Sequence, residues 1–372
     1  MARRGENIYH RRDGRWEGRY IKGRKPCGKP YFGYVYGCSY GEVKKRLLPL
    51  KAAYCELRAE GRYTGPFRDY LLAHLAEKRQ SPIKASSYDS YYRIVHSHLL
   101  PTLGEVPAHR LTERHVRQFL SDLRNQGLSD STVRNIFRFL CGVTKKAAKT
   151  GAMERDVCAD ITLPKPRLEA VHALSRPQQK ALECAAMSTL ESGVGHGIEV
   201  ILALYTGMRV GEICALRWED VDFDRETIRV RHTMQRLNLY DAGAKTAVRL
   251  GPPKSGSSAR EIPMSARLSR LLLDLRRGTA GEFVVTGRQG FAEPRVVQYR
   301  FERLLEQARL PHMGFHATRH SFATRCLELG VDVATISRLL GHSSAKMTLD
   351  VYTDSLPEQR RAAMRKLDAL AA

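Results

Sequence analysis

The chain has 372 residues, of which 42% are hydrophobic and 27% charged, a composition typical of a folded protein of two or three domains rather than of a disordered basic tail. Its 62 lysines and arginines outnumber 39 acidic residues, and the net charge of +23 favours an anionic partner, nucleic acid before an acidic membrane surface. A generally basic surface without a specific partner is the alternative. No apolar run approaches the about 20 residues that span a bilayer, and no apolar stretch follows the basic start, so we expect neither a membrane span nor a secretory signal.

The first 65 residues form a separate charged module, because they carry a net charge of +10 in under a fifth of the length. Three segments are strand-like: residues 7–11, 15–21 and 29–36. Asp13-Gly14 is a hairpin signal between the first two, and residues 42–60 are expected to be helical, with a kink at Pro49. A hinge is expected at residues 61–66.

The second strand of this module alternates between two kinds of side chain. Trp16, Gly18 and Tyr20 can face the helix, whereas Arg15 and Arg19 point the other way. A twisted sheet with one cationic face can enter the major groove of DNA, and we favour DNA contact for it. The alternative is a basic edge sheet that only keeps the domain soluble.

Residues 66–163 show helical patterns only. One run, which Pro101 and Gly104 are expected to stop, is followed by two helices with Thr112 and Ser129 as N-caps. Their apolar stripes are predicted to form the core: Val116, Phe119, Leu120, Leu123, Val133, Ile136, Phe137, Leu140 and Val143. Basic residues occupy the other surfaces, and those expected to contact DNA are Arg117, Arg134, Arg138, Lys145 and Lys146. Singly, each is better explained as part of a solvated helix face, but together they suit a helical domain laid across phosphates.

An extended linker is predicted at Leu163-Pro164-Lys165-Pro166, because proline restricts both itself and the residue before it. Residues 168–372 are expected to be helical with a small inserted sheet. The expected helices lie at 198–205, ending at Gly207, at 210–217, and after the sheet to the end of the chain. The expected strands are 226–234, 248–252 and 259–263, the last two joined by a turn at 254–257.

Several kinds of site are missing from the sequence. It contains no Gly-x-x-x-x-Gly-Lys-Ser/Thr phosphate loop, no dinucleotide fingerprint and no Gly-x-Ser-x-Gly. No dense acidic cluster is present that would hold two catalytic Mg²⁺ ions, which disfavours a metal-dependent nuclease. The eight cysteines form no Cys-x-x-Cys, so we expect reduced thiols rather than disulfides or a zinc module.

The last domain instead holds a set of cations, imidazoles and one tyrosine in turns and at helix starts. The set comprises Arg209, His316, Arg319, His342 and Tyr352. Taken alone, each is more often a surface, turn or half-buried residue. A zinc site at His312, His316 and His320 is disfavoured, because a proline and a glycine interrupt that helix.

The ordered set Arg209, Lys254, His316-x-x-Arg319, His342 and Tyr352 resembles that of the tyrosine recombinases, the integrases of phages and integrative conjugative elements. The flanking segments Leu-Tyr-Thr-Gly-Met-Arg-Val-Gly-Glu, His-x-x-Arg-His-Ser-Phe-Ala-Thr, Leu-Leu-Gly-His-Ser-Ser and Asp-Val-Tyr-Thr match as well. One departure is Glu154-Arg155-Asp156, where the family often has Asn-Pro.

The resemblance implies a multi-domain, mainly α fold with small β-sheets. It divides the chain into three domains: an arm-type DNA-binding domain of a three-stranded sheet plus a helix at 1–64, a helical core-binding domain at 66–163, and an α+β catalytic domain with a C-terminal tail helix at 168–372. Ala363, Leu367 and Leu370 share one face of this tail at 357–370. The tail either docks onto a neighbouring protomer, and so gates Tyr352, or packs in cis.

A phosphodiester gains charge on its non-bridging oxygens when it is attacked. Two guanidiniums, those of Arg209 and Arg319, can clamp these oxygens and stay protonated without a metal. Glu212, one turn after Arg209, can hold the first guanidinium in place. His342 can donate a hydrogen bond to the same phosphate.

Attack by a phenol requires proton transfers. Tyr352 must lose its proton as it attacks, and His316 can accept that proton or orient the phenol. Lys254 can protonate the leaving 5′-oxygen. The family mechanism implies a 3′-phosphotyrosine at Tyr352, and since one ester is exchanged for another, no cofactor is required.

We therefore predict a site-specific DNA recombinase that integrates and excises a mobile element. The resemblance implies as partners double-stranded DNA with core-type and arm-type sites, further copies in a homotetramer on synapsed DNA, and accessory proteins of the kind of a directionality factor and a host DNA-bending protein. We expect it in the bacterial cytoplasm, associated with the nucleoid. Two alternatives stay open: a type IB topoisomerase, against which the N-terminal module argues, and a non-catalytic DNA-binding architectural protein, against which the complete residue set argues.

Overall fold

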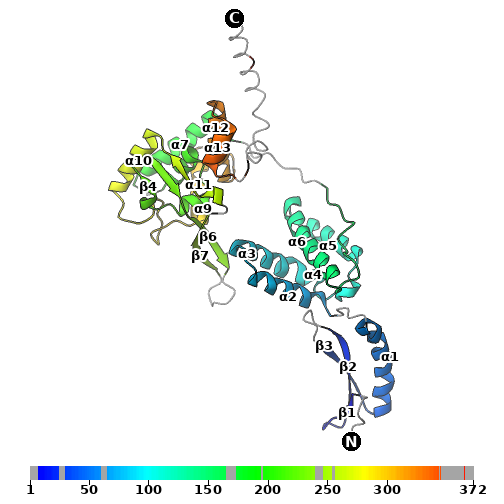
Figure 1. Cartoon of the computed structure of the whole chain (residues 1–372). Helices are drawn as coiled ribbons and strands as arrows, with labels where there is room; N and C mark the ends of the chain where they lie inside the picture. The colour runs from blue at the N-terminus through cyan, green and yellow to red at the C-terminus, as the bar shows by residue number, and fades with distance from the viewer. Residues whose placement is uncertain are drawn as a thin grey trace. The chain divides into compact units, whose positions relative to one another are not determined.

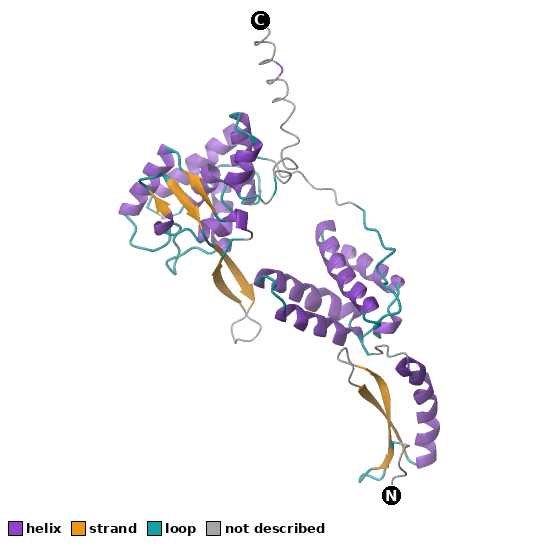
Figure 2. Cartoon of the chain, in the orientation of Figure 1, coloured by secondary structure: helices purple, strands orange, loops and turns teal. Residues whose placement is uncertain are grey.

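The computed structural model describes residues 7–24, 30–59, 65–164, 173–193, 196–238, 246–253, 256–342, 344 and 364. The chain divides into two compact units, Met1–Arg167 and Leu168–Ala372 (Figure 1). The fold is mainly helical with small sheets, as the sequence predicts (Figure 2). In the part of the chain that the structure describes, no helix is both long and apolar enough to cross a bilayer.

The N-terminal module is a three-stranded antiparallel sheet followed by one helix. Its elements are β1 (Ile8–His10), β2 (Trp16–Arg24), β3 (Pro30–Gly37) and α1 (Tyr40–Ala59). Val43 and Leu47 of α1 are buried with Ile8, and they lie against the sheet face that carries Gly18, where a Cβ would come within 2.7 Å of Val43. The predicted packing of α1 on this face is therefore confirmed.

The opposite sheet face combines arginines with aromatic rings. Tyr34 and Tyr36 are exposed there, and the Arg19 guanidinium lies 3.5 Å from the centre of the Phe32 ring. The Arg15 guanidinium lies 5.9 Å from the centre of the Tyr36 ring. Because an aromatic face attracts a cation, these rings hold the cations on one side of the sheet.

The rest of the first unit is helical. Its elements are α2 (Phe67–Gln80), α3 (Ala85–Ile94), η1 (Val95–Leu99), α4 (Leu100–Leu103), η2 (Ala108–Arg110), α5 (Glu113–Asn125) and α6 (Asp130–Lys149). Thr112 and Ser129 are the N-caps of α5 and α6, as predicted; the Thr112 N–H donates to His115 Nδ1 at 3.2 Å, and the Ser129 hydroxyl accepts from the Thr132 N–H. All nine predicted stripe residues of these two helices are buried in one core.

The helix before Gly104 continues through Pro101, contrary to the expectation that both residues stop it. The π-helical turn η1 precedes this proline, and in it the Leu100 N–H donates to the Val95 carbonyl. The Thr102 hydroxyl donates to the His98 carbonyl at 2.7 Å. A wider turn accommodates a ring that lacks an N–H, so the helix ends only at Leu103.

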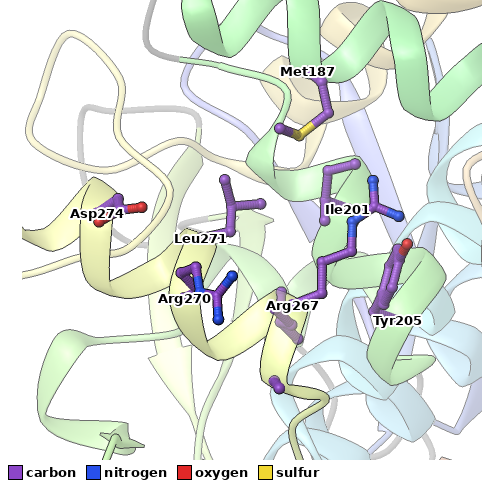
Figure 3. A pocket seen from close by; sticks show the side chains of 9 residues that line it. Met187, Ile201, Tyr205, Arg267, Arg270, Leu271 and Asp274 are labelled. Carbon is purple, nitrogen blue, oxygen red and sulfur yellow. The ribbon is translucent and has the colours of Figure 1, made fainter.

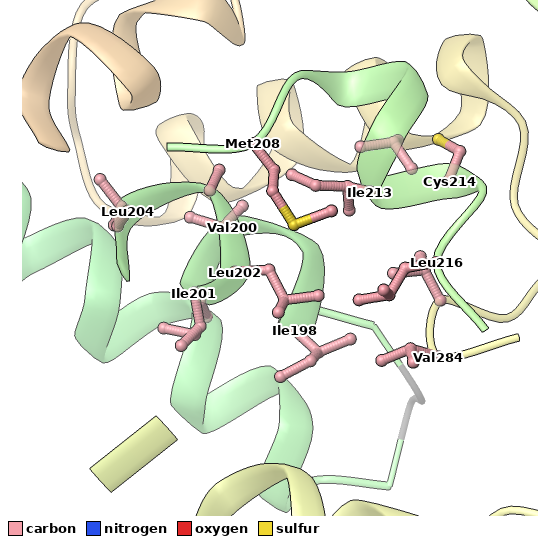
Figure 4. Close-up of a cluster of buried hydrophobic side chains, with 14 of the residues drawn as sticks. Ile198, Val200, Ile201, Leu202, Leu204, Met208, Ile213, Cys214, Leu216 and Val284 are labelled. Atoms are coloured by element: carbon pink, nitrogen blue, oxygen red, sulfur yellow. The ribbon is translucent and has the colours of Figure 1, made fainter. Parts of the chain in front are cut away.

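The described part of the second unit contains seven α-helices and two small sheets, and α8 is largely buried within it. Its helices are α7 (Arg176–Glu191), α8 (Ile198–Thr206), α9 (Val210–Cys214), α10 (Ala266–Arg277), α11 (Pro294–Gln307), α12 (His316–Glu328) and α13 (Val333–Leu340). Its strands are β4 (Val221–Asp222), β5 (Thr227–Val230), β6 (Thr233–Asn238), β7 (Thr246–Gly251) and β8 (Arg260–Pro263), with 3-10 turns η3 (Trp218–Asp220) and η4 (Gly256–Ser258). Apolar side chains of α8, such as Ile198 and Leu202, meet Met208, Ile213 and Val284 in the core (Figure 4). Gly207 ends α8 as predicted, in the left-handed conformation with a φ of 64°.

Two predictions about the strands of this unit are wrong in detail. Residues 226–234 form two strands in different sheets, because β5 pairs with β8 whereas β6 pairs with β7. For the same reason β7 and β8 are not the two arms of one hairpin around residues 254–257. Ile228, Val230 and Met234 are all buried at even spacing, so the alternation continues across the break and does not reveal it.

The helix predicted at 210–217 ends at Cys214. The backbone after it bonds elsewhere, since the Val284 N–H donates to the Leu216 carbonyl at 3.0 Å and the Trp218 N–H donates to the Glu282 carbonyl at 3.0 Å. These long-range bonds replace the helical ones, and they were not visible in the local pattern.

Candidate active site

Arg209 lies in the turn between α8 and α9, where it is the residue before the first turn of α9. Its guanidinium forms an ion pair with Glu212, with 2.8 Å between Arg209 Nη1 and Glu212 Oε1, and its backbone N–H donates to Glu212 Oε2 at 3.0 Å. Arg209 Nη2 also donates to the Gly341 carbonyl at 3.4 Å. The side chain of Arg209 remains 29% exposed, so its guanidinium can still meet an anion from solvent.

Arg319 lies on the first turn of α12 and is only 3% exposed. It joins two helix ends, because Nη1 donates to the Gly207 carbonyl at 2.6 Å and Nη2 donates to the Leu340 carbonyl at 2.6 Å. The last carbonyls of a helix have no partner within that helix and carry partial negative charge. The two helix ends thus orient the Arg319 guanidinium.

His316 and His342 lie beside these arginines and are neutral at neutral pH. Burial, followed by the charges of His320, Arg319 and Arg209, lowers the pKa of His316 to about 4. Burial, followed by the charges of neighbouring arginines, likewise lowers the pKa of His342 to about 4. Each imidazole therefore presents one nitrogen that can accept a proton and one that can donate a hydrogen bond.

Arg260 was not among the residues expected from the sequence. It lies on β8 with its side chain 6% exposed, and its Nη2 atom is 3.0 Å from Oε2 of Glu212, whose side chain is 3% exposed. Burial raises the pKa of Glu212, but the charge and hydrogen bond of Arg260, with the N–H and charge of Arg209, outweigh burial and bring that pKa below its ordinary value. One buried carboxylate is thus kept ionised between two arginines.

The alternation of buried and exposed residues in β8 could have indicated a role for Arg260. Arg260 has the same parity as Ile262 and Met264, which are buried, so it occupies an inward position of the strand. An arginine at such a position needs a buried partner.

Lys254 and Tyr352 lie outside the described residues, as does the tail at 357–370 apart from residue 364. Residues 61–64 of the hinge expected at 61–66, and the predicted linker from Lys165 onward, also lie outside the described residues. The structure therefore brings together Arg209, Glu212, His316, Arg319 and His342 of the predicted catalytic set.

The residues predicted to contact DNA lie in the first unit and differ in how they are held. Arg117 pairs with Glu113, Lys146 pairs with Glu77, and Arg15 pairs with Asp13. Arg134 donates to the carbonyls of Leu163 and Pro164, which ties α6 to the start of the predicted linker. The Arg19 guanidinium lies over the Phe32 ring, and Arg138 Nη1 donates to Asn135 Oδ1 at 3.4 Å. The side chain of Lys145 is exposed.

A separate cavity of about 340 Å³ lies between α7, α8 and α10 (Figure 3). Met187, Ile201 and Leu271 give it an apolar floor, and Arg267 and Tyr205 stand at its side. None of the predicted catalytic residues lines it.

Comparison with known proteins decides the family. The model of the phage integrase family matches residues 184–359. Tyrosine recombinase XerA of Thermococcus onnurineus is 30% identical over 273 residues, which cover 69% of this chain and 82% of the relative. The chain belongs to the phage integrase family of tyrosine recombinases.

Two further similarities extend over more of the chain. A XerC-like tyrosine recombinase of Caldanaerobacter subterraneus is 25% identical over 369 residues, covering 89% of this chain and 91% of the relative. The fold is similar to that of the Tn1549 transposon integrase in complex with a circular intermediate DNA, with a TM-score of 0.69 and 21% identity over 82% of this chain and 100% of that chain. The tyrosine recombinase described here is accordingly an enzyme that breaks and rejoins DNA, and site-specific recombination is its class of reaction.

Proposed function

We propose that this recombinase integrates and excises a mobile element and that it cleaves DNA by forming a 3′-phosphotyrosine at Tyr352. The observation that carries the proposal is the convergence of Arg209, Arg319 and His342 where α8, α12 and α13 end or begin. The similarity to the integrase of the transposon Tn1549 supports a mobile element as the substrate.

The phosphate is held by charge that is fixed before DNA binds. Arg209 and Arg319 each have their guanidinium oriented by carbonyls or by Glu212, so neither side chain needs to reorganise when a phosphate oxygen arrives. His342 donates its ring N–H to the same phosphate. The second negative charge that develops in the transition state is therefore met by cations already in position.

Proton transfer is assigned to His316 and Lys254. In the free protein burial, followed by the neighbouring charges, lowers the pKa of His316, but a bound phosphate anion cancels part of the field of the arginines and raises that pKa. His316 then accepts the Tyr352 proton as the phenol oxygen bonds to phosphorus and the 5′-oxygen leaves. Lys254 protonates that 5′-oxygen, and attack by a 5′-hydroxyl from the partner strand reverses the exchange.

The assembly follows from the number of strands exchanged. Recombination between two duplexes requires four strand exchanges, and we assign one to each protomer of a homotetramer. We assign core-type sites to residues 66–372 and arm-type sites to the sheet of residues 1–64, whose free face holds Arg15 and Arg19. Binding at two sites through one chain increases avidity. We place its action on chromosomal DNA in the bacterial cytoplasm, with a directionality factor and a DNA-bending protein as accessory partners.

A suicide substrate tests this function. Nicked duplexes that tile the ends of the DNA element carrying the gene are incubated with the full chain, and covalent protein–DNA complexes are counted after denaturation. We expect trapping on one duplex, with and without EDTA, and its loss in Tyr352→Phe but not in Tyr299→Phe, which changes an exposed tyrosine on α11. Absence of trapping on every duplex would favour a non-catalytic DNA-binding protein, and relaxation of a supercoiled plasmid without any such site would favour a type IB topoisomerase.

A further inference from the structure

We propose that Arg260 is a positioning residue of the recombinase active site, which fixes Arg209 through Glu212 and fixes the turn that carries His342. This inference rests on the proposed function of those residues. The side chain of Arg260 is only 6% exposed, so we do not expect it to contact DNA itself.

The first link runs from Arg260 to Arg209. The Glu212 carboxylate uses Oε1 to hold the Arg209 guanidinium at 2.8 Å and Oε2 to accept from Arg260 at 3.0 Å. Because Oε2 also accepts from the Arg209 backbone N–H, the carboxylate is held at three points. Removing Arg260 leaves a buried carboxylate with one cationic partner, which raises its pKa and releases its orientation.

The second link runs from Arg260 to the end of α13. Arg260 Nε donates to the Leu339 carbonyl at 2.5 Å, which is one of the last carbonyls of that helix. Gly341 ends α13 with a φ of 65° and lies directly on Arg260, since a Cβ at Gly341 would come 3.1 Å from Arg260 Cδ and Nη1. His342 is the next residue, so the position of its backbone depends on this contact.

The third link reaches the segment next to Lys254. Arg260 Nη1 donates to the Ser258 carbonyl at 2.9 Å, at the end of η4, which starts two residues after Lys254 in the sequence. Three nitrogens of one guanidinium therefore hold three segments, and each segment leads to a residue of the proposed mechanism. A lysine has one nitrogen and cannot make these three contacts in the same geometry.

The matched control is Arg229 on the neighbouring strand β5. It pairs with two carboxylates, Asp222 at 3.1 Å and Glu261 at 3.2 Å, and its neighbour Val230 is the partner of Arg260 across the sheet. In the described part of the chain, the ion pairs of Arg229 are with these two carboxylates, and neither belongs to the site. Arg229→Met thus removes a paired arginine from the same sheet without touching the site.

The first measurement needs no DNA. Thermal midpoints of the full chain, followed by Trp218 fluorescence in a Trp16→Phe background, are compared for Arg260→Met, Arg260→Lys and Arg229→Met between pH 5 and 7. We expect Arg260→Met to lose stability relative to the control as the pH rises, because Glu212 must then ionise with a single cation beside it. In the double variant Arg260→Met/Glu212→Gln we expect this extra pH dependence to disappear, because the carboxylate that causes it is gone. An equal pH dependence in Arg260→Met and Arg229→Met overturns the first link, whether or not the protein cleaves DNA.

The second measurement is single-turnover cleavage of the duplex that traps the wild-type protein. We expect Arg260→Met to cleave about 10- to 100-fold more slowly with DNA affinity changed less than about 3-fold, since small displacements of catalytic groups cost rate rather than binding. Arg260→Lys, which keeps the charge beside Glu212, recovers part of the rate, and Arg229→Met cleaves normally. Normal cleavage by Arg260→Met overturns the inference, whereas failure of the wild-type protein to cleave any duplex overturns the proposed function.

Discussion

Gly207 connects the stability of the catalytic unit with the geometry of its arginines, and Gly207→Ala tests both. The residue has a φ of 64°, a region that costs an L-residue about 1–2 kcal/mol. An alanine Cβ would also lie 2.5 Å from Cδ1 of Phe322 and 2.8 Å from Cδ2 of Leu340, and such overpacking adds about 1–3 kcal/mol. We therefore expect the variant to lose about 2–5 kcal/mol.

Gly330→Ala is the matched control, because it separates the backbone cost from the steric cost. Gly330 has a φ of 82° after the end of α12, and nothing lies within 4 Å of a Cβ built there. It should lose about 1–2 kcal/mol only. For a unit of this size each kcal/mol lowers the thermal midpoint by about 2–4 °C, so Gly207→Ala should melt about 2–12 °C below the control.

The assay uses the two tryptophans of the chain, Trp16 and Trp218. In a Trp16→Phe background the fluorescence of the buried Trp218 follows the catalytic unit alone. Cleavage of the suicide substrate is measured below both midpoints, where Gly207→Ala should be slower than Gly330→Ala, since the Gly207 carbonyl accepts from Arg319. Equal midpoints for the two variants would refute the steric part of this reasoning, and equal cleavage would refute the role of the carbonyl.

Two other outcomes follow from the charges. Because the pKa of His316 is lowered to about 4 in the folded chain, the unfolded chain binds the extra proton first as the pH falls. The stability that the neutral imidazole contributes is therefore fully present above about pH 6.5 and is lost as the pH falls toward 4. The thermal midpoint of His316→Gln should change less between pH 7 and 5 than that of the wild type, and an equal change in both proteins would contradict the burial of a neutral imidazole. DNA affinity should fall about 1,000-fold or more between 50 and 200 mM salt. Lys145→Gln, which removes an exposed cation of α6, should reduce the slope of log affinity against log salt concentration by about one, whereas Arg134→Gln should leave that slope unchanged. Filter binding at several salt concentrations measures the slope of each protein, and the same slope for the wild type and both variants would contradict phosphate contact by Lys145.

Local signals predicted the fold well where local chemistry decides it. Thr112 and Ser129 begin helices and Gly207 ends one, because a cap is decided by a few neighbouring atoms. The break between β5 and β6 was missed, since a change of sheet leaves the buried parity of Ile228 and Met234 intact. The early end of α9 was missed as well, because its cause is a bridge between Arg217 and Phe283, far apart in the sequence.

The same distinction applies to the candidate site. Arg209, His316, Arg319 and His342 could be named from the sequence, because their local contexts resemble those of a family. How they are held could not be predicted, since the acceptors of Arg319 are carbonyls at Gly207 and Leu340, and a carbonyl has no sequence signature. Arg260 was missed because its importance depends on Glu212, which lies 48 residues earlier in the chain.

These contacts also explain how so many cations can be collected in one place. Arg209 and Arg260 share one carboxylate, Glu212, and Arg319 lies close enough to the same imidazoles to lower their pKa values. Cations gathered in this way would repel one another strongly without compensation. The carbonyls of Gly207, Leu339 and Leu340 supply part of that compensation, and they do so with neutral dipoles that leave the net positive charge for the substrate. A carboxylate in place of these carbonyls would attract the guanidiniums more strongly, but it would compete with the phosphate for them. Helix ends that converge on buried arginines are therefore a physical solution to holding cations in place while keeping them available to an anion.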